Sequence, residues 1–327
     1  MKTLFISDLD GTLLTSRETI SEYSMQKLNS LIDGRGVCFT YATARSLNSA
    51  AKACWGLRQN LPVILYNGAL IMDPSTRKML YNNHFTREQL AYIRALFDSF
   101  QVWPLVYYFR DGIERVSWQE GTETPGVRRY LDRRRGDSRL YPVDSADRIE
   151  GADIFYFTCI GKKEELDGLR DAVEANPQLK CIYQQETYQT DYWCEIMPKD
   201  TSKGTAAREL KHMLGAEKLL VFGDAVNDTE LFLAADERYA VQNAEESLKK
   251  LATRVIGFCE EDAVAKFIEE NHVGLAIDNL NNLDDVLAQI TDDEYKTIKQ
   301  NAINMAMRLR EGHYTKAALD QIVKQVM

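Results

Sequence analysis

The sequence predicts an α/β protein: a doubly wound, Rossmann-like core with a parallel sheet, an inserted α/β domain and a C-terminal helical extension. Three observations support this prediction. Apolar strands alternate with helices over residues 3–66, the pattern changes near residue 82, and the alternation returns after residue 197. Such alternation is typical of parallel strands joined by crossover helices. The expected domains are residues 1–82 and 190–272 for the core, 83–189 for the insertion and 273–327 for the extension.

The first part of the chain carries the beginning of the core. Apolar strands of one parallel sheet are expected over residues 3–7, 37–41 and 63–66. Ser21 is suited to cap the helix between the first two strands, and Ser46 begins the helix that follows the second. These elements predict two successive strand-helix-strand units.

The middle of the chain has a different order of predicted strands and helices. Apolar residues 105–109 and 113–118 flank Arg110-Asp111-Gly112, a sequence that favours a hairpin. Further strands are expected over residues 154–160, 180–184 and 192–197, with helices over 86–100 and 163–175. This block predicts a second, smaller α/β domain inserted in the first.

The parallel pattern then resumes. Ser202 begins a helix, and strands over residues 219–222, 239–241 and 255–258 precede a helix over 262–270. In the extension, Thr291 and Glu294 form a capping box, and apolar residues recur at helical spacing. We expect this extension to dock on its own core or to form a homo-oligomer through its helices.

Composition excludes several classes of function. The chain has 327 residues, 45% of them hydrophobic and 27% charged, with a net charge of −9. This negative balance argues against nucleic acid as a partner, because binding its phosphate backbone needs basic surface. No apolar run is long enough for a membrane span or a signal peptide. The six cysteines are scattered without a C-x-x-C pair, which favours reduced thiols and a cytoplasmic protein.

The strongest motif is Asp8-Leu9-Asp10-Gly11-Thr12-Leu13-Leu14, directly after an apolar strand. The carboxyl end of such a strand is where α/β sheets bind ligands. Two carboxylates two residues apart suit phosphoryl transfer: one attacks phosphorus, and the other protonates the leaving oxygen and then activates water. The alternative interpretation is an ordinary acidic turn. The strand before the motif and the Gly-Thr-Leu-Leu sequence after it favour the catalytic interpretation.

A second acidic motif, Gly223-Asp224-Ala225-Val226-Asn227-Asp228, also follows an apolar strand. Carboxylates in this position suggest a hard cation, and Mg²⁺ needs only one or two of them besides water and substrate phosphate. The alternative is an Asn/Asp-rich turn. Two further residues complete the set: Thr43, whose hydroxyl could meet a phosphate oxygen, and Lys203, whose ammonium would offset the clustered carboxylates. Either residue alone would be interpreted as structural.

At this point the sequence resembles the haloacid dehalogenase superfamily and, within it, the Cof-type phosphatases with a large α/β cap. Besides Asp8–Leu14, the similar motifs are Ala42-Thr43-Ala44-Arg45, Tyr66-Asn67-Gly68-Ala69, Ser202-Lys203-Gly204 and Gly223–Asp228. Their order along the chain is that of the family, and the match covers roughly residues 1–272. Ala44 and Gln242 stand where the family usually has glycine, which bears on substrate fit more than on the reaction.

The resemblance implies a magnesium-dependent phosphatase that hydrolyses small phosphorylated metabolites, such as sugar phosphates or phosphorylated cofactors, through an aspartyl-phosphate. Asp8 would be the nucleophile and Asp10 the general acid and base. Mg²⁺ would be held by Asp8, by the backbone carbonyl of Asp10 and by Asp224, with Asp228 supporting its water shell or orienting Lys203. Phosphate would be bound by Thr43, Lys203 and Asn227, and Arg45 and Asn67 are further candidates for substrate contact. The alternatives are a phosphomutase with the same intermediate, and a catalytically idle module that senses phosphate or acts as a scaffold.

Overall fold

The structure is a computed structural model that describes residues 2–185, 190–271, 295, 296, 298–303 and 307. The chain forms two compact units. The first contains the described residues of 1–63, 74–76 and 207–327, and the second contains those of 64–73 and 77–206. The second unit therefore includes residues on both sides of the insertion that the sequence assigns to 83–189.

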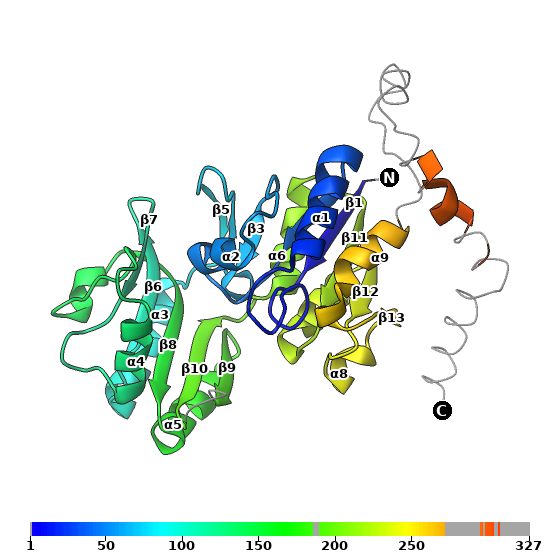
Figure 1. The fold of residues 1–327 in the computed structure, drawn as a ribbon. Coiled ribbons are helices and arrows are strands. Elements are labelled where there is room, and N and C mark those ends of the chain that lie inside the picture. Colours follow the sequence, from blue (N-terminus) through cyan, green and yellow to red (C-terminus); the bar gives the residue numbers. More distant parts are fainter. Residues whose placement is uncertain (1, 186–189, 272–294, 297, 304–306, 308–327) are drawn as a thin grey trace. The chain divides into compact units, whose positions relative to one another are not determined.

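The first unit is built on a five-stranded sheet. Its strands are β1 (Thr3–Ser7), β2 (Cys38–Tyr41), β11 (Lys218–Gly223), β12 (Glu237–Ala240) and β13 (Arg254–Val255). They lie in the order β13-β12-β11-β1-β2, and every pair is parallel (Figure 1). The chain leaves β1 toward β2 on one side and continues from β11 toward β12 on the other, so the strand order reverses between β1 and β11. The predicted parallel core is confirmed.

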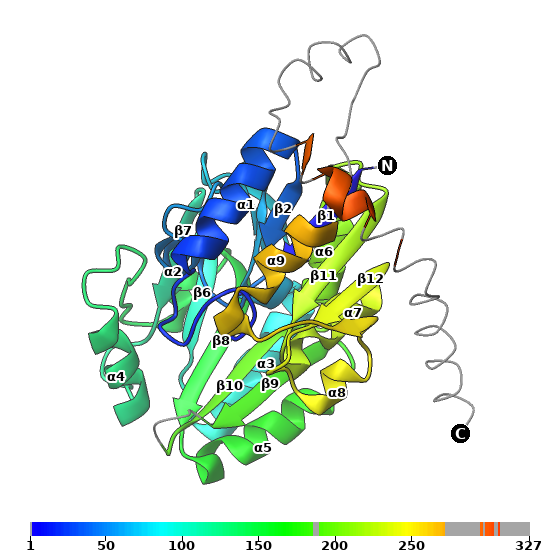
Figure 2. The same cartoon turned by 45° about the vertical axis from the view of Figure 1, so that its right-hand side comes forward.

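Three helices of this unit, those after Ser21 and Ser46 and the one predicted over 262–270, are confirmed, whereas the short helices and turns between residues 226 and 261 were not predicted. The helices of this unit are α1 (Glu22–Arg35), α2 (Leu47–Ala53), α7 (Thr229–Ala234), α8 (Glu246–Lys249), α9 (Ala263–Asn271) and the 3-10 turns η3 (Val226–Asp228) and η4 (Cys259–Glu261). Ser21 caps α1 by accepting a hydrogen bond from the backbone N–H of Ser24, and Gly36 ends it in the left-handed conformation. Helices α1 and α9 lie side by side against the sheet (Figure 2).

The second unit contains an antiparallel sheet. Its strands are β6 (Leu105–Arg110), β7 (Ile113–Ser117), β8 (Asp153–Gly161), β9 (Leu179–Gln185) and β10 (Tyr192–Pro198), in the order β7-β6-β8-β10-β9. The predicted hairpin is confirmed, because Asp111 and Gly112 both have positive φ, as a tight turn between twisted strands requires. The register shifts between Tyr107 and Tyr108 of β6, which leaves Phe155 of β8 without a partner of its own.

Helices cover the two faces of this sheet differently. On one face, α3 (Arg87–Phe100) and α5 (Lys163–Glu174) bury an apolar cluster that includes Ile93, Phe157 and Leu169. On the other, α4 (Pro125–Arg133) packs on β8, where a Cβ atom at Gly126 would lie 2.4 Å from Ile160 Cγ2. A short turn, η2 (Ala146–Ile149), precedes β8. Residues 157 and 160 face opposite sides because side chains alternate along a strand.

One expected strand lies elsewhere. Residues 63–66 are predicted to form a third strand of the parallel sheet, but β3 (Val63–Leu65) belongs to a separate three-stranded sheet with β4 (Leu70–Met72) and β5 (Met79–Asn82). That prediction is wrong. The 3-10 turn η1 (Tyr66–Gly68) has three successive residues with positive φ, so the chain turns sharply and β4 takes its place beside β3. The sequence did not reveal β4 and β5.

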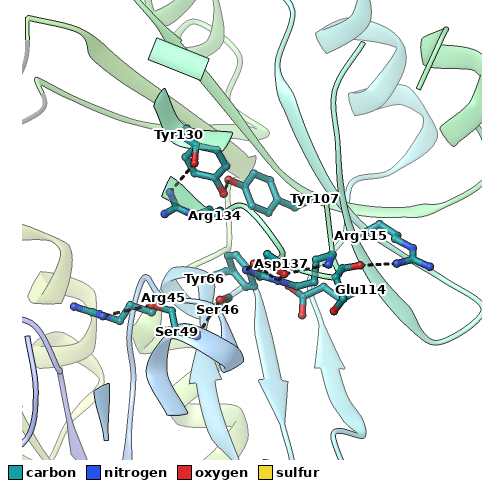
Figure 3. A network of polar contacts seen from close by, with 12 residues as sticks. Arg45, Ser46, Ser49, Tyr66, Tyr107, Glu114, Arg115, Tyr130, Arg134 and Asp137 are labelled. Carbon is teal, nitrogen blue, oxygen red and sulfur yellow. Dashed lines mark hydrogen bonds and ion pairs between the residues drawn. The ribbon is translucent and has the colours of Figure 1, made fainter. Parts of the chain in front are cut away.

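A buried charged network stabilises this turn within the second unit. The hydroxyl of Tyr66 donates a 2.5 Å hydrogen bond to Glu114 Oε1 (Figure 3), and Arg139 Nη1 lies 2.7 Å from the same oxygen and 2.6 Å from the Tyr66 hydroxyl. Arg139 also pairs with Asp137 at 2.5 Å. Tyr66, Glu114 and Arg139 are each less than 10% exposed, so the charges are withdrawn from water and compensate one another.

The predicted helical extension, residues 273–327, lies mostly outside the described residues, as does the capping box of Thr291 and Glu294. Its described members, 295, 296, 298–303 and 307, are helical. Asn301 Nδ2 donates a 2.8 Å hydrogen bond to the carbonyl oxygen of Glu269 near the end of α9. All six cysteines are free thiols. Within the described part of the chain, no helix has the length and apolar character needed to span a membrane.

Candidate active site

Asp8 stands immediately after the central strand β1. Its backbone N–H donates a 2.9 Å hydrogen bond to the carbonyl oxygen of Phe222, which extends the pairing of β1 with β11 by one residue. The side chain is only 5% exposed. A buried carboxylate at this point lies where the strand order reverses, which is where open α/β sheets bind ligands.

The second acidic motif follows the neighbouring strand β11. Asp228 is fully buried, and its Oδ2 accepts hydrogen bonds from the backbone N–H groups of Asp224 and Ala225 at 3.1 and 3.3 Å. A Cβ atom at Gly223 would lie 2.7 Å from Asp228 Oδ2, so the absence of a side chain there lets Asp228 fold back over the strand end. The carbonyl oxygen of Asp224 accepts a 2.8 Å hydrogen bond from the N–H of Glu245. These contacts fix the turn that presents Asp224.

Asp8, Asp224 and Asp228 form one cluster. A carboxylate oxygen of each lies within 4.8 Å of those of the other two. At this separation, two unit charges repel by roughly 3–4 kcal/mol at an effective dielectric constant of 20. A divalent cation would turn this repulsion into attraction, and carboxylate oxygens are the ligands that hard cations prefer. The donor set and its burial therefore fit a metal site.

The loop after β1 is shaped around the same cluster. Gly11 has a φ of +77°, and a Cβ atom there would lie 2.3 Å from Asp224 Oδ2. Thr12 donates a 2.9 Å hydrogen bond from its hydroxyl to Asp224 Oδ1, and Asn243 Nδ2 donates one of 2.7 Å to the carbonyl oxygen of Gly11. The first acidic motif thus supplies both a carboxylate and a support for the carboxylate of the second motif.

Asp10 lies apart from the carboxylate cluster and pairs with Arg45. Arg45 Nε and Nη2 bind the two carboxylate oxygens of Asp10 at 2.8 and 2.5 Å, and Nη2 also reaches Glu18 at 3.1 Å. The hydrogen bond to Asp10 raises the pKa of the Arg45 guanidinium. The Asp10 side chain is half exposed, whereas that of Arg45 is mostly covered. This arrangement leaves Asp10 accessible to a substrate while fixing its orientation.

Two expected phosphate ligands belong to the same unit. Thr43 follows β2 and is fully buried, and its hydroxyl accepts a 3.1 Å hydrogen bond from the N–H of Arg45. Asn227 lies in η3, next to Asp228, and is exposed. The carboxyl ends of β1, β2 and β11 meet at one edge of a parallel sheet. The fold therefore brings Thr43 and Asn227 to the edge that carries Asp8.

The remaining candidates, Asn67 and Lys203, lie in the second unit. Asn67 is buried in η1 with a φ of +54°, and its Nδ2 donates a 3.3 Å hydrogen bond to the hydroxyl of Tyr156. Lys203 is 1% exposed and begins helix α6 (Lys203–Met213). An ammonium group is rarely buried to this degree unless it is paired. Its predicted role as a phosphate ligand stays a prediction.

Several residues of the site were not found from the sequence. Thr12 lies inside the first motif, four residues after Asp8, and its place in that motif is the signal that could have identified it. The pairing of Arg45 with Asp10 joins residues 35 positions apart, and the supports from Asn243 and Glu245 come from the far end of the chain. No local pattern marks such contacts, because they depend on which strands lie side by side.

Comparison with known proteins agrees with this geometry. The chain is 24% identical over 270 residues to a 5-amino-6-(5-phospho-D-ribitylamino)uracil phosphatase of Bacillus subtilis, covering 82% of this chain and 96% of that protein. It is 26% identical over 271 residues to an HMP-PP phosphatase of Yersinia pseudotuberculosis, covering 80% and 92% of the two chains. A crystal structure from Thermotoga maritima superposes with a TM-score of 0.67 over 86% of this chain and all of that one, at 24% identity.

Two family models match the sequence. A model of the C-terminal domain of glucosyltransferase 3-like proteins matches residues 258–322, a stretch that lies mostly outside the described residues. A model of haloacid dehalogenase-like hydrolases matches residues 5–268, which include every motif of the candidate site. The predicted family is therefore confirmed, and the chain belongs to the haloacid dehalogenase-like hydrolases.

Proposed function

We propose that this hydrolase is a magnesium-dependent phosphatase of small phosphorylated metabolites that works through an aspartyl-phosphate on Asp8. The observation that carries the proposal is the cluster of Asp8, Asp224 and Asp228 at the carboxyl ends of β1 and β11. The names of the relatives support it, because the curated proteins described above are phosphatases of phosphorylated small molecules.

The reaction would proceed in two steps. An Asp8 carboxylate oxygen attacks the phosphorus of the ester, the bond from phosphorus to the substrate oxygen breaks, and Asp10 gives its proton to that oxygen. A water molecule then attacks phosphorus, Asp10 takes a proton from it, and the bond to Asp8 breaks with release of inorganic phosphate. Asp8 and Asp10 end in their starting forms.

Charge neutralisation falls to the surrounding groups. Asp8, the backbone carbonyl of Asp10 and Asp224 would hold Mg²⁺, with Asp228 supporting its water shell or orienting Lys203. The ion would neutralise charge on the transferred phosphoryl group. The Thr43 hydroxyl, the Asn227 amide and the Lys203 ammonium would bind its oxygens, and Asn67 would contact the rest of the substrate.

Arg45 takes a more specific role in this proposal than substrate contact. Its guanidinium binds both oxygens of Asp10, so it would hold the general acid and base toward the leaving oxygen. A planar fork of donors matches a carboxylate in this way, whereas a lysine would not. Arg45 is therefore a positioning residue for Asp10.

The test is phosphate release from a panel of sugar phosphates, nucleotides and phosphorylated cofactors. Asp8→Asn keeps the shape of the side chain but removes the attacking anion, so release should fall at least about 1,000-fold. Asp33→Asn is the matched control, because Asp33 forms a surface pair with Arg58. Asp8→Asn activity above about a tenth of wild type would contradict the nucleophile assignment.

The same experiment separates the alternatives. A phosphomutase would convert a sugar phosphate into its isomer with little free phosphate. An idle sensing or scaffold module would bind phosphate esters without releasing phosphate from any of them. The intact pair of Asp8 and Asp10 favours hydrolysis, since a module that only binds phosphate has no need of a general acid.

The remaining expectations concern the location of the protein in the cell and its oligomeric state. Six free thiols fit a reducing compartment, so we propose a cytoplasmic location. The hydrogen bond from Asn301 to Glu269 supports docking of the extension on its own core. Removal of residues 273–327 should lower the melting temperature without changing turnover, and assembly into a homo-oligomer would instead appear as a change in hydrodynamic size.

A further inference from the structure

The loop that follows Asp10 ends in a short hairpin, residues 14–20. The first and last of these residues form an antiparallel bridge, and the N–H of Thr15 donates a 3.0 Å hydrogen bond to the carbonyl oxygen of Thr19. The tip of the hairpin, residues 16–18, is exposed. Because the hairpin continues the loop that carries Asp10, its position bears on the position of that carboxyl group.

The tip of the hairpin is connected to Asp10 through Arg45. Glu18 lies 3.1 Å from Arg45 Nη2, and the same nitrogen lies 2.5 Å from Asp10 Oδ1. The backbone of Glu18 is left-handed, with a φ of +57°. A residue with a side chain persists in this conformation only where its surroundings enforce it. The tip therefore needs contacts that hold it beside Arg45.

One such contact comes from η4, the turn before α9. The backbone N–H of Ser16 donates a 2.5 Å hydrogen bond to Glu260 Oε1. Both residues are exposed. A hydrogen bond that is open to water contributes little to stability, because water can replace the carboxylate. The contact with Glu260 instead determines where the tip of the hairpin lies.

The turn η4 is itself held against the loop after β1. The Asn243 side chain bridges the two, since its Nδ2 donates a 2.7 Å hydrogen bond to the carbonyl oxygen of Gly11 and its Oδ1 accepts one of 3.0 Å from the N–H of Cys259. Cys259 begins η4 and directly precedes Glu260. The turn is therefore fixed to the base of the loop, one residue after Asp10.

A second contact holds the same turn beyond the hairpin. Asp262 directly follows η4, and its Oδ1 accepts hydrogen bonds from the hydroxyls of Ser21 and Ser24 at the start of α1. The turn is thus fixed on both sides of the hairpin, before it through Gly11 and after it through Ser21. Glu260 contacts the tip between these two points.

We propose that Glu260 is a positioning residue for Asp10. By accepting the N–H of Ser16, Glu260 keeps Glu18 beside Arg45, and Arg45 in turn keeps the Asp10 carboxyl directed toward the leaving oxygen. This role needs no contact between Glu260 and the substrate. The inference rests on the proposed phosphatase function, because it takes Asp10 as the general acid and base.

The test separates positioning of Asp10 from a general loss of structure. The constants kcat and KM are measured for the alkyl phosphate of the panel above that wild type hydrolyses fastest, and for p-nitrophenyl phosphate, whose leaving group needs less protonation. Glu260→Ala should lower kcat about tenfold for the alkyl ester and less than about threefold for the aryl ester, with KM little changed. Glu260→Gln keeps an acceptor oxygen for Ser16, so it should retain most of the turnover.

Glu261→Ala is the matched control. Glu261 is an exposed carboxylate of the same turn, but its Oε2 accepts a hydrogen bond from the N–H of Phe258. This variant should leave the ratio of kcat between the two esters unchanged. Equal losses for both esters in Glu260→Ala, or no loss for either, would overturn the proposal.

A double-variant cycle tests whether Glu260 acts through Arg45. In Arg45→Lys the grip on Asp10 is already lost, so adding Glu260→Ala should lower kcat for the alkyl ester by less than about a further threefold. Two residues that act independently would instead give losses that multiply. The full tenfold loss in the Arg45→Lys background would therefore contradict this route.

Hydrogen exchange distinguishes this inference from the proposed function. Exchange of the backbone N–H groups of residues 14–20, followed by mass spectrometry, needs no turnover. It should be at least about threefold faster in Glu260→Ala and unchanged in Glu261→Ala. If wild type releases no phosphate but the exchange is faster, the phosphatase function fails and the hold of Glu260 on the hairpin stands. If wild type releases phosphate and the exchange is unchanged, only the role of Glu260 fails.

Discussion

Arg45 and Asp10 form a two-pronged ion pair, with Arg45 Nε 2.8 Å from Asp10 Oδ2 and Nη2 2.5 Å from Oδ1. The pair joins the loop after β1 to the loop after β2, which contains Thr43 and Arg45. The backbone N–H of Arg45 also donates a hydrogen bond to the Thr43 hydroxyl. One residue thus contacts the expected general acid through its side chain and an expected phosphate ligand through its backbone N–H. The orientation of Asp10 therefore depends on Arg45.

Replacing Arg45 should reduce turnover more than binding. In Arg45→Lys, a single ammonium cannot hold both oxygens of Asp10, so we expect kcat to fall roughly 10- to 100-fold. The loss should be greater for alkyl than for aryl phosphates, because alkyl leaving groups need more protonation. Arg58→Lys, which alters a surface pair with Asp33, is the control. Steady-state kinetics on both substrate types would show equal losses if Arg45 did not position Asp10.

Gly11 offers a test of the loop geometry. A Cβ atom in Gly11→Ala would lie 2.3 Å from Asp224 Oδ2, at a φ of +77°, so the alanine must displace the carboxylate. We expect at least a 100-fold loss of kcat/KM and a higher magnesium requirement, since both depend on Asp224. Gly36→Ala isolates the backbone effect, because Gly36 also has positive φ but no atom lies within 4 Å of its added Cβ. Gly36→Ala should lower the free energy of unfolding by about 1 kcal/mol and leave activity intact. Similar activity in Gly11→Ala and Gly36→Ala would contradict the close approach of Gly11 to Asp224.

Metal binding should be visible in stability as well as in activity. Mg²⁺ would relieve the repulsion among Asp8, Asp224 and Asp228, so it should raise the melting temperature, by mass action on the folded state. Excess chelator should abolish phosphate release, and added Mg²⁺ should restore it. Asp224→Asn should remove most of the thermal shift, whereas Asp33→Asn should keep it. Full activity in chelator would exclude the proposed chemistry.

The network around Tyr66 predicts a large and non-additive effect on stability (Figure 3). Arg139→Met would leave the buried Glu114 without its cation, which should lower the free energy of unfolding by about 3–5 kcal/mol. The double variant with Glu114→Gln should lose less than the single one. Arg148→Met, which removes an exposed pair with Asp144, should cost less than about 1 kcal/mol. Chemical denaturation of wild type, Arg139→Met, Glu114→Gln, the double variant and Arg148→Met measures these differences, and strict additivity of the two single variants would argue against a coupled network.

Glu195 predicts a pH dependence of stability. Burial raises the pKa of its carboxyl from 4.5 to about 7 in the folded chain, so the folded state binds a proton that the unfolded state has lost. This contribution is present in full below about pH 4.5 and is lost as the pH rises through 7. Its size is at most about 3 kcal/mol. The unfolding free energy of wild type should therefore fall relative to that of Glu195→Gln between pH 5 and 8. A constant difference over this range would show that the carboxyl is not perturbed.

The sequence determined the elements whose causes are local. Ser21 and Gly36 mark the ends of α1 because their side-chain and backbone chemistry act within one helical turn. Asp111 and Gly112 predict the hairpin for the same reason. Asp8 and Asp224 could be placed together from the sequence because each directly follows an apolar strand, and the carboxyl ends of neighbouring parallel strands share one edge.

Only the tertiary structure decided the contacts between distant residues. A strand is confirmed over residues 63–65, but Tyr66 belongs to the turn that follows it. The pairing of β3 with β4 depends on this left-handed turn, which buried Arg139 and Glu114 stabilise from more than 40 positions away. The pairing of Asp10 with Arg45 likewise depends on the side-by-side placement of β1 and β2, whose ends the two residues follow. Local sequence determines where a strand begins and ends. Which strand lies next to it, and in which register, depends on the burial of the apolar faces of the whole sheet.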